Sequence, residues 1–233
     1  MKRRALLGLI LLIVVVAGII ILAKTSREGG DTATIELPTP KHEGEVSVEE
    51  AIFKRKSIRR YRAGSLTLQE VSQLLWSAGG KTIDGLTGAT RAYPSAGGIY
   101  PLEIYLVAGD VEGLADGVYL YKWQDHSLNL VKKGDLRGDL SEAALGQRMV
   151  DDAPISLIFT AVSARTERRY GRRGTTRYLG MDVGGAGQNV HLQAEALGLG
   201  TVIIGAFSDE AVQKAIGVTG EEPLYIMPVG KPL

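Results

Sequence analysis

The chain has 233 residues, 45% of them hydrophobic and 23% charged, which is the composition of an ordinary globular protein with one domain and a tail. Lys and Arg number 27 and Asp and Glu 26, so no large net field favours binding to nucleic acid. Cysteine is absent, which excludes disulfides, cysteine-ligated zinc, iron–sulfur clusters and thiol catalysis, and the three histidines fit no metal-binding spacing.

The N-terminal segment has the pattern of a membrane anchor. Three basic residues at positions 2–4 precede residues 5–23, which carry no charge and can cross a hydrocarbon core of ~30 Å at ~1.5 Å per residue. The basic flank predicts a single-pass protein with a cytoplasmic N-terminus and an extracytoplasmic domain. A cleaved signal peptide and a twin-arginine export signal are the alternatives. Residues 24–45 predict a linker, and residues 46–233 the folded domain.

The domain is expected to begin with two helices. Residues 47–50 form a capping box that predicts a helix ending near Lys54. A second capping box at residues 67–70 precedes apolar residues at helical spacing, and the glycines at positions 79–80 should end this helix. Residues 81–101 are rich in Gly, Thr, Pro and Ser and predict a loop.

Strands and helices alternate in the rest of the domain. Strands are expected at residues 102–108, 117–123, 128–131, 154–162, 201–204 and 223–229. Helices are expected at residues 135–147, 166–197 and 208–217. The continuous apolar run over 154–162 is typical of a strand buried on both faces. The pattern predicts an α+β fold with a mixed sheet of four to five strands flanked by helices.

A basic segment at the end of the first helix indicates an anion site. Residues 54–62 hold six cations and one serine in nine positions. Guanidinium groups bind phosphate through two parallel hydrogen bonds, and a serine hydroxyl adds a further donor. A solvated basic face is the ordinary alternative for a charge run of this kind.

Three further segments could complete a ligand site. Residues 94–101 hold a serine and two glycines, which let the backbone approach a flat ligand, although a tight loop explains them equally well. The strand over 201–204 leads into Gly205 and Ala206, whose N–H groups could face the polar edge of a ligand. Lys231 follows the last strand.

In order and spacing, these motifs resemble the nitroreductase family of flavoproteins, which bind FMN. The matching segments are Arg55-Lys56-Ser57-Ile58-Arg59, Pro94-Ser95, residues 197–207 and Gly230-Lys231. The resemblance covers about residues 47–232. It implies a nitroreductase-like fold, a homodimer, FMN as cofactor and NAD(P)H as a candidate reductant.

The resemblance also implies roles for the basic residues. Arg55, Ser57 and Lys231 resemble the clamp on the FMN phosphate, and Lys56 resembles a phosphate or ribityl contact. Arg59 resembles the cation beside the N1 and O2 atoms of the flavin, where it would stabilise the anionic reduced form.

Two other groups carry over by the same resemblance. Gln147 would contact the ribityl chain or the ring, and the N–H groups of Gly205 and Ala206 would face N5 and O4 of the flavin. The family builds its sites across a dimer interface, so one set of residues would come from the partner subunit. Those residues are Ser95, Ala96 and Gly97.

The loop over 94–101 looks most like that of the SagB-type dehydrogenase branch, which includes enzymes that oxidise azolines to azoles in peptides. Such enzymes use a Lys–Tyr pair as acid and base, and Arg177 with Tyr178 is the closest match. The expected catalytic residues are therefore Arg59, Arg177 and Tyr178.

The leading hypothesis is a membrane-anchored FMN-dependent oxidoreductase that moves a hydride or electrons between a reductant and a small-molecule or peptide acceptor. The alternatives are a SagB-type azoline-peptide dehydrogenase and a non-catalytic module that binds flavin or another ligand. The expected associations are a second copy of the chain and a membrane through residues 5–23.

Overall fold

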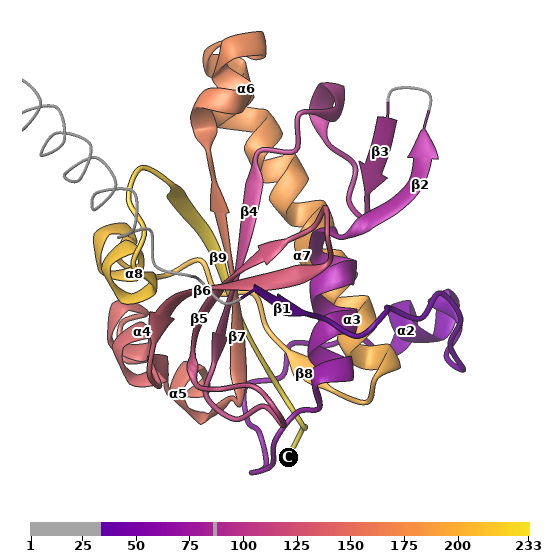
Figure 1. Ribbon diagram of the computed structural model, residues 1–233, viewed down its shortest axis with the longest axis vertical. Helices are drawn as coiled ribbons and strands as arrows, with labels where there is room; N and C mark the ends of the chain where they lie inside the picture. The colour runs from indigo at the N-terminus through magenta and orange to yellow at the C-terminus, as the bar shows by residue number, and fades with distance from the viewer. Residues whose placement is uncertain (1–33, 86–87) are drawn as a thin grey trace, which may run out of the picture. The chain divides into compact units, whose positions relative to one another are not determined.

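The computed structural model describes residues 34–85 and 88–233 (Figure 1). The chain divides into two units, Met1–Ala33 and Thr34–Leu233, and every described residue belongs to the second. Residues 34–45, expected as part of a linker, thus belong to the compact unit.

The predicted location in a membrane is corrected by the structure. In the part of the chain that the structure describes, no helix combines the length and the apolar character that a membrane span requires. Helix α7, Leu179–Ala196, has 18 residues but carries Asp182, His191 and further polar side chains along its length. The predicted anchor, residues 5–23, lies outside the described residues.

Seven strands form the central sheet in the order β1-β6-β5-β4-β7-β9-β8, and every ladder is antiparallel. Their bounds are β1 Thr34–Glu36, β4 Leu102–Ala108, β5 Gly117–Lys122, β6 Ser127–Lys133, β7 Ile155–Ala161, β8 Gly200–Thr201 and β9 Glu222–Gly230. The expected number of four to five strands was too low. Strand β1 has only three residues, too few to show an alternating pattern.

The predicted loop over residues 81–101 contains a second, small sheet. Strands β2, Lys81–Gly85, and β3, Gly88–Arg91, pair antiparallel. The short 3-10 helix η1, Ala96–Gly98, follows them. The two strands are short and mostly polar, so their sequence does not show the apolar alternation from which strands are recognised.

Helices cover both faces of the central sheet, which confirms the expected α+β arrangement (Figure 1). Helices α3, Leu68–Gly79, and α7 lie on one face, and α2, Val48–Lys54, packs on α7. Helices α4, Arg137–Ala143, α5, Arg148–Asp152, and α8, Asp209–Ile216, lie on the other face.

Strand β4 shows why the apolar runs are continuous. Ile104 and Leu106 belong to the core cluster beneath α3 and α7, whereas Tyr105 and Val107 belong to the cluster beneath α4 and α8. Alternate side chains point to opposite faces, so a strand covered on both sides must be apolar at every position. All residues of β7 are buried, as predicted for this segment.

The predicted long helix over 166–197 is divided. It consists of α6, Ser163–Tyr170, the π-helical turn η2, Gly174–Tyr178, and α7. The break falls at Gly171, whose φ of 57° and ψ of −151° lie outside the helical region. Likewise, the predicted helix over 135–147 ends at α4, because Leu145 and Gly146 have positive φ values.

Candidate functional site

The basic segment lies along the edge of the central sheet. Ser57 forms a parallel bridge with Thr201 of β8, and the N–H of Ile58 donates to the Thr201 carbonyl at 2.9 Å. Further along, the N–H of Arg62 donates to the Lys231 carbonyl at 3.0 Å. Residues 57–62 therefore run beside both β8 and the C-terminal residues that follow β9.

Two paired glycines make this close approach possible. Gly200 of β8 and Gly230 of β9 are partners in the antiparallel ladder. A Cβ on Gly200 would lie 2.6 Å from the Cγ2 atom of Ile58, and a Cβ on Gly230 would lie 3.0 Å from the ring of Tyr61. The sequence did not reveal that this glycine pair makes room for the basic segment, although both glycines occur in the motifs described above.

Three cations of the segment have no acidic partner in the part of the chain that the structure describes. Arg55 is half-buried, and Lys56 and Arg59 are exposed. Within residues 34–85 and 88–233, no carboxylate lies within ion-pair distance of any of the three, whereas Lys54 pairs with Glu50 at 2.5 Å. Adjacent unpaired cations repel one another, and a phosphate would remove that repulsion. The donor set, which includes the exposed hydroxyl of Ser57, therefore fits the phosphate of FMN.

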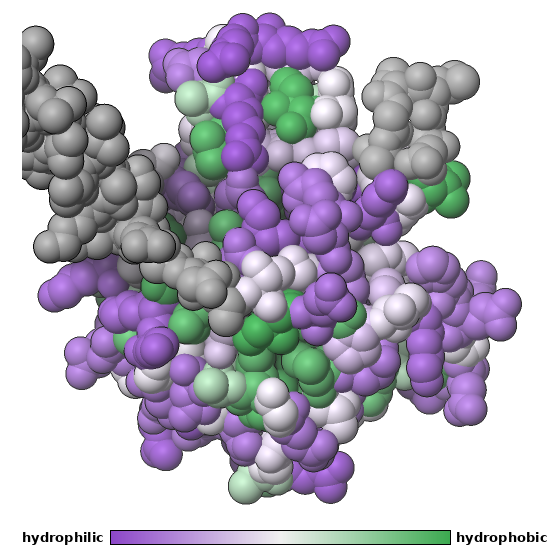
Figure 2. Space-filling view, viewed as in Figure 1, coloured by the Kyte–Doolittle hydropathy of each residue, from purple (hydrophilic) through white to green (hydrophobic). Residues whose placement is uncertain are grey.

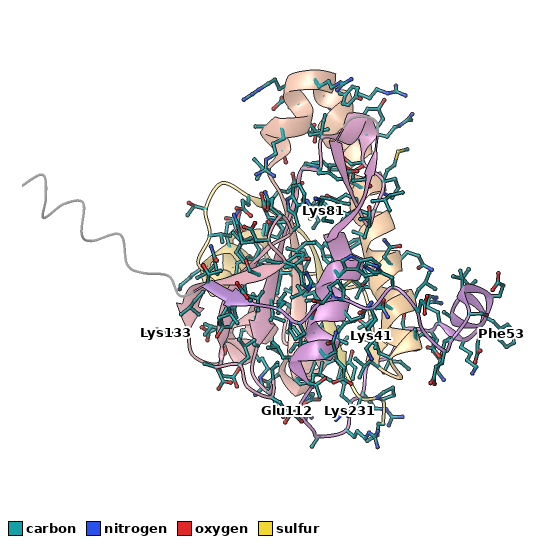
Figure 3. The ribbon with its side chains drawn as sticks, turned by 45° about the vertical axis from the view of Figure 1, so that its right-hand side comes forward. Lys41, Phe53, Lys81, Glu112, Lys133 and Lys231 are labelled. Carbon is teal, nitrogen blue, oxygen red and sulfur yellow. The ribbon has the colours of Figure 1, made fainter. Side chains whose placement is uncertain are left out.

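Lys231 is brought to this segment by its backbone, but its side chain is engaged elsewhere. Its Nζ donates to the carbonyl of Ser65 at 2.9 Å (Figure 3). The structure thus places Lys231 beside residues 60–62 and does not join its ammonium group to Arg55.

A buried histidine adjoins Arg55. His191 of α7 is only 5% exposed, and burial together with the positive charge of Arg55 lowers the pKa of its imidazole to about 4. The ring is therefore neutral near pH 7 and adds no further charge beside Arg55. The sequence pattern did not indicate this contact, because the histidines were weighed above only as metal ligands.

A second group of predicted residues is brought together between α5 and α8. The Nε2 atom of Gln147 donates to the carbonyls of Ala144 and Ala206, both at 2.9 Å. Gly205 and Ala206 are exposed, and their N–H groups meet no acceptor among the described residues. A Cβ on Gly205 would meet nothing within 4 Å, so its backbone is open to a ligand.

The third group, Ser95 to Gly97, is held by α7. The hydroxyl of Ser95 donates to Asp182 Oδ2 at 2.5 Å, and the N–H of Ala96 lies 3.4 Å from Asp182 Oδ1. Burial raises the pKa of Asp182, while these two hydrogen bonds act against that shift. The carboxylate therefore fixes the conformation of the loop.

The basic segment and the loop at Ser95 contact α7 at different points. Asp182 and His191 are nine residues apart in this helix, which is about 14 Å at the helical rise. Within one chain, the loop at Ser95 therefore does not close over the basic segment.

The predicted catalytic residues are also separated. Tyr178 of η2 packs edge-on against Tyr170, with ring centroids 4.9 Å apart, and its hydroxyl accepts a hydrogen bond from Arg173 at 3.1 Å. Arg177 is exposed on the same turn, whereas Arg59 lies on the basic segment.

Comparisons with known proteins agree with this architecture. Residues 52–231 match the family profile described as "Nitroreductase family". A protein of Methanocaldococcus jannaschii that is named as a nitroreductase is 43% identical over 202 residues, which are 87% of this chain and 98% of the relative.

Solved structures show the same fold. A nitroreductase crystal structure from Ralstonia eutropha has a TM-score of 0.74 at 27% identity, covering 88% of this chain and 92% of the other. The NADPH:FMN oxidoreductase of Vibrio harveyi in complex with NAD⁺ has a TM-score of 0.57 at 22% identity, covering 79% of this chain and 68% of the other, which shows likeness of fold alone.

Proposed function

The chain belongs to the nitroreductase family and is an oxidoreductase, and we propose that it uses FMN to move electrons from a reductant such as NAD(P)H to an organic acceptor. The observation that carries the proposal is the basic segment seated on the sheet edge. Arg55, Lys56 and Arg59 have no acidic partner among the described residues, and they flank Ser57, whose hydroxyl is exposed.

In this proposal, the basic segment binds the phosphate end of the cofactor. Arg55 and Ser57 hold the phosphate, Lys56 contacts the phosphate or ribityl chain, and Lys231 joins them by leaving the Ser65 carbonyl. Arg59 stabilises negative charge at the N1 and O2 edge of the ring. When bound, FMN supplies the centre that accepts and gives up a hydride.

The second group orients the ring. The N–H groups of Gly205 and Ala206, which meet no acceptor among the described residues, would donate to the polar edge of the flavin, and Gln147 donates to the Ala206 carbonyl. Fixed donors of this kind act without reorganisation when charge develops on the ligand.

We also propose that the site is completed in a homodimer, in which Ser95, Ala96 and Gly97 of one protomer face the flavin held by the other. The separation of the two groups along α7 supports this arrangement. So do the exposed apolar side chains on α2 and α7: Ile52 is 57% exposed, Phe53 88% and Met181 62%. Phe53 projects from the outer end of α2 (Figure 3).

The proposal is tested on the purified full-length chain. We expect bound FMN, seen as a flavin absorption band, and rapid reoxidation of the photoreduced protein by quinones or nitroaromatic compounds. A protein that binds FMN but is not reoxidised would favour the non-catalytic binding module. A colourless protein that ignores added FMN would contradict the cofactor assignment.

Azoline dehydrogenation is a second candidate, favoured by the loop over 94–101 and its resemblance to SagB-type enzymes. Asp182 fixes this loop, and the loop contacts Arg169 of α6, next to Tyr170, whose ring packs on Tyr178. In the same assay, oxidation of an azoline peptide would support this activity, and no turnover of such peptides would remove it.

A further inference from the structure

Residues 163–178, which we call the arginine arm, form a helical hairpin between β7 and α7. In these 16 positions the chain has six arginines and one glutamate, whereas the net charge of the whole chain is +1. The arginines are Arg165, Arg168, Arg169, Arg172, Arg173 and Arg177. All six are exposed, and Figure 2 shows the hydrophilic surface that covers the region of α6.

Most of these arginines have no acidic partner within residues 34–85 and 88–233. Of the six arginines in the arm, only Arg165 forms an ion pair within the described residues, with Glu103 at 2.5 Å. Arg169 donates to the Gly97 carbonyl at 3.3 Å. Arg168 and Arg172 make no side-chain hydrogen bond or ion pair within the described part of the chain. Like charges on neighbouring turns of a helix repel one another, so a bound anion would relieve this repulsion and stabilise the arm.

The arm is a packed structure and not a loose basic tail. Gly174 lies directly on α6, because a Cβ there would come 2.8 Å from Thr166 Cγ2 and 2.9 Å from the Thr166 carbonyl oxygen. The edge-on contact between Tyr170 and Tyr178 ties its two halves together. The arginines are therefore presented from a fixed scaffold, which lowers the entropy lost when a ligand binds.

The arm lies against the loop that is proposed to face the flavin. Arg169 contacts the Gly97 carbonyl, and a Cβ on Gly97 would clash with the Tyr170 hydroxyl. At the base of the arm is a polar cavity of about 450 Å³, lined in part by Gly98, Lys122 and Arg165. A space of this size suits a small molecule.

We propose that the arginine arm binds the anionic groups, phosphate or carboxylate, of a small redox substrate while its reacting part reaches the flavin. The inference rests on the proposed function and adds the class of substrate: a molecule with several negative charges. Arginine forks recognise both groups through paired hydrogen bonds, and the clustered charge raises the local concentration of anions.

The test compares reoxidation of the photoreduced, FMN-loaded full-length protein by ferricyanide, which is an anion, and by neutral benzoquinone. The double variant Arg168→Glu with Arg172→Glu should slow the ferricyanide reaction by at least about tenfold at low ionic strength and leave the benzoquinone reaction unchanged. The loss should disappear in about 1 M NaCl.

The matched control carries Lys133→Glu and Lys214→Glu, which change the net charge equally on exposed residues of β6 and α8. It should keep most of the ferricyanide rate. If both variants lost the same fraction of the ferricyanide rate, the effect would come from net charge alone and the proposal would be overturned. An unchanged ferricyanide rate in the arm variant would overturn it as well.

Competition separates the two anion sources. Slowing of the ferricyanide reaction by inorganic pyrophosphate would assign the arm to phosphate groups, and slowing by citrate alone would assign it to carboxylates. If the protein holds no FMN, the proposed function fails, and calorimetry with pyrophosphate then tests the arm. Binding that the arm variant retains in full would overturn the inference.

Discussion

His191 illustrates how burial sets the charge of one side chain beside the basic segment. The imidazole is almost fully buried in α7, and Arg55 adds a repulsive positive charge, so the protonated form is disfavoured twice. A neutral ring next to Arg55 leaves the guanidinium as the charge available to an anion. Asp182 acts through its hydrogen bonds instead, since its carboxylate accepts a hydrogen bond from Ser95 and holds that loop.

This burial predicts a specific dependence of stability on pH. The folded pKa of His191, about 4, lies below the unfolded value of 6.5, so the unfolded state binds more protons between these limits. Stability from this group is complete above pH 6.5 and is lost as the pH falls towards 4. When the pH is lowered from 7 to 5, the free energy of unfolding should therefore fall in both proteins. The fall should be about 2 kcal/mol smaller in His191→Gln than in the wild type.

Urea unfolding of both proteins at the two pH values measures this difference. Asp182 and all other titrating groups are shared, so their contributions cancel. Equal pH dependence in the two proteins would show that His191 is not protonated on unfolding as the account requires.

At the scale of elements, the site depends on the contact between the basic segment and strands β8 and β9. The segment uses its own backbone to extend the sheet edge, and the paired glycines leave room for Ile58 and Tyr61. The residues proposed to bind the phosphate are therefore positioned by packing on the sheet edge.

Gly200→Ala should disrupt this contact. The new Cβ would lie 2.6 Å from Ile58 Cγ2, so the segment must move. We expect the dissociation constant for FMN, measured by fluorescence titration, to rise at least about tenfold, with a stability loss of about 1–3 kcal/mol. Gly44→Ala is the control, because its Cβ would meet nothing within 4 Å. Unchanged FMN affinity in Gly200→Ala would contradict the claim that FMN binding depends on the position of the basic segment.

Elements marked by local signals could be predicted from the sequence. The capping box of α3 is present in full, Ser47 accepts a hydrogen bond from the Glu50 N–H, and Gly217 ends α8 in the left-handed conformation. Strand β1 was not predicted, because its pairing with β6 depends on residues far away in the sequence.

For the site, residue types could be predicted, but contacts could not. The motifs identify Arg55, Ser57 and Lys231 as candidates, yet no local signal shows that Lys231 binds the Ser65 carbonyl. Nor does the sequence show that His191 lies beside Arg55, since these residues are brought together only by the packing of α2 on α7.

At the scale of the whole molecule, the proposed dimer accounts for apolar side chains that a monomer leaves in water. Val48, Ile52 and Phe53 are exposed on α2, and Met181 is exposed on α7, the helix on which α2 packs. Exposed apolar patches of this kind mark protein interfaces. A second copy would cover them and bring the loop at Ser95 to the partner's basic segment.

Phe53→Glu should therefore weaken self-association of the full-length protein. Because Phe53 is 88% exposed, the change leaves the monomer core intact. We expect the dimer dissociation constant from sedimentation equilibrium to rise at least about tenfold, together with loss of FMN. Val131→Glu on β6 is the control at another exposed apolar position. A monomeric wild type that binds FMN tightly would contradict the shared site.

The central claim is that the basic segment, seated on the edge of the sheet, binds the terminal phosphate of FMN. Titration of the apoprotein with FMN and with riboflavin, which lacks that phosphate, tests it most directly. The account predicts affinity for FMN higher by a factor on the order of 100, and loss of most of this difference in Arg55→Ala. Equal affinities for FMN and riboflavin in the wild type would contradict it.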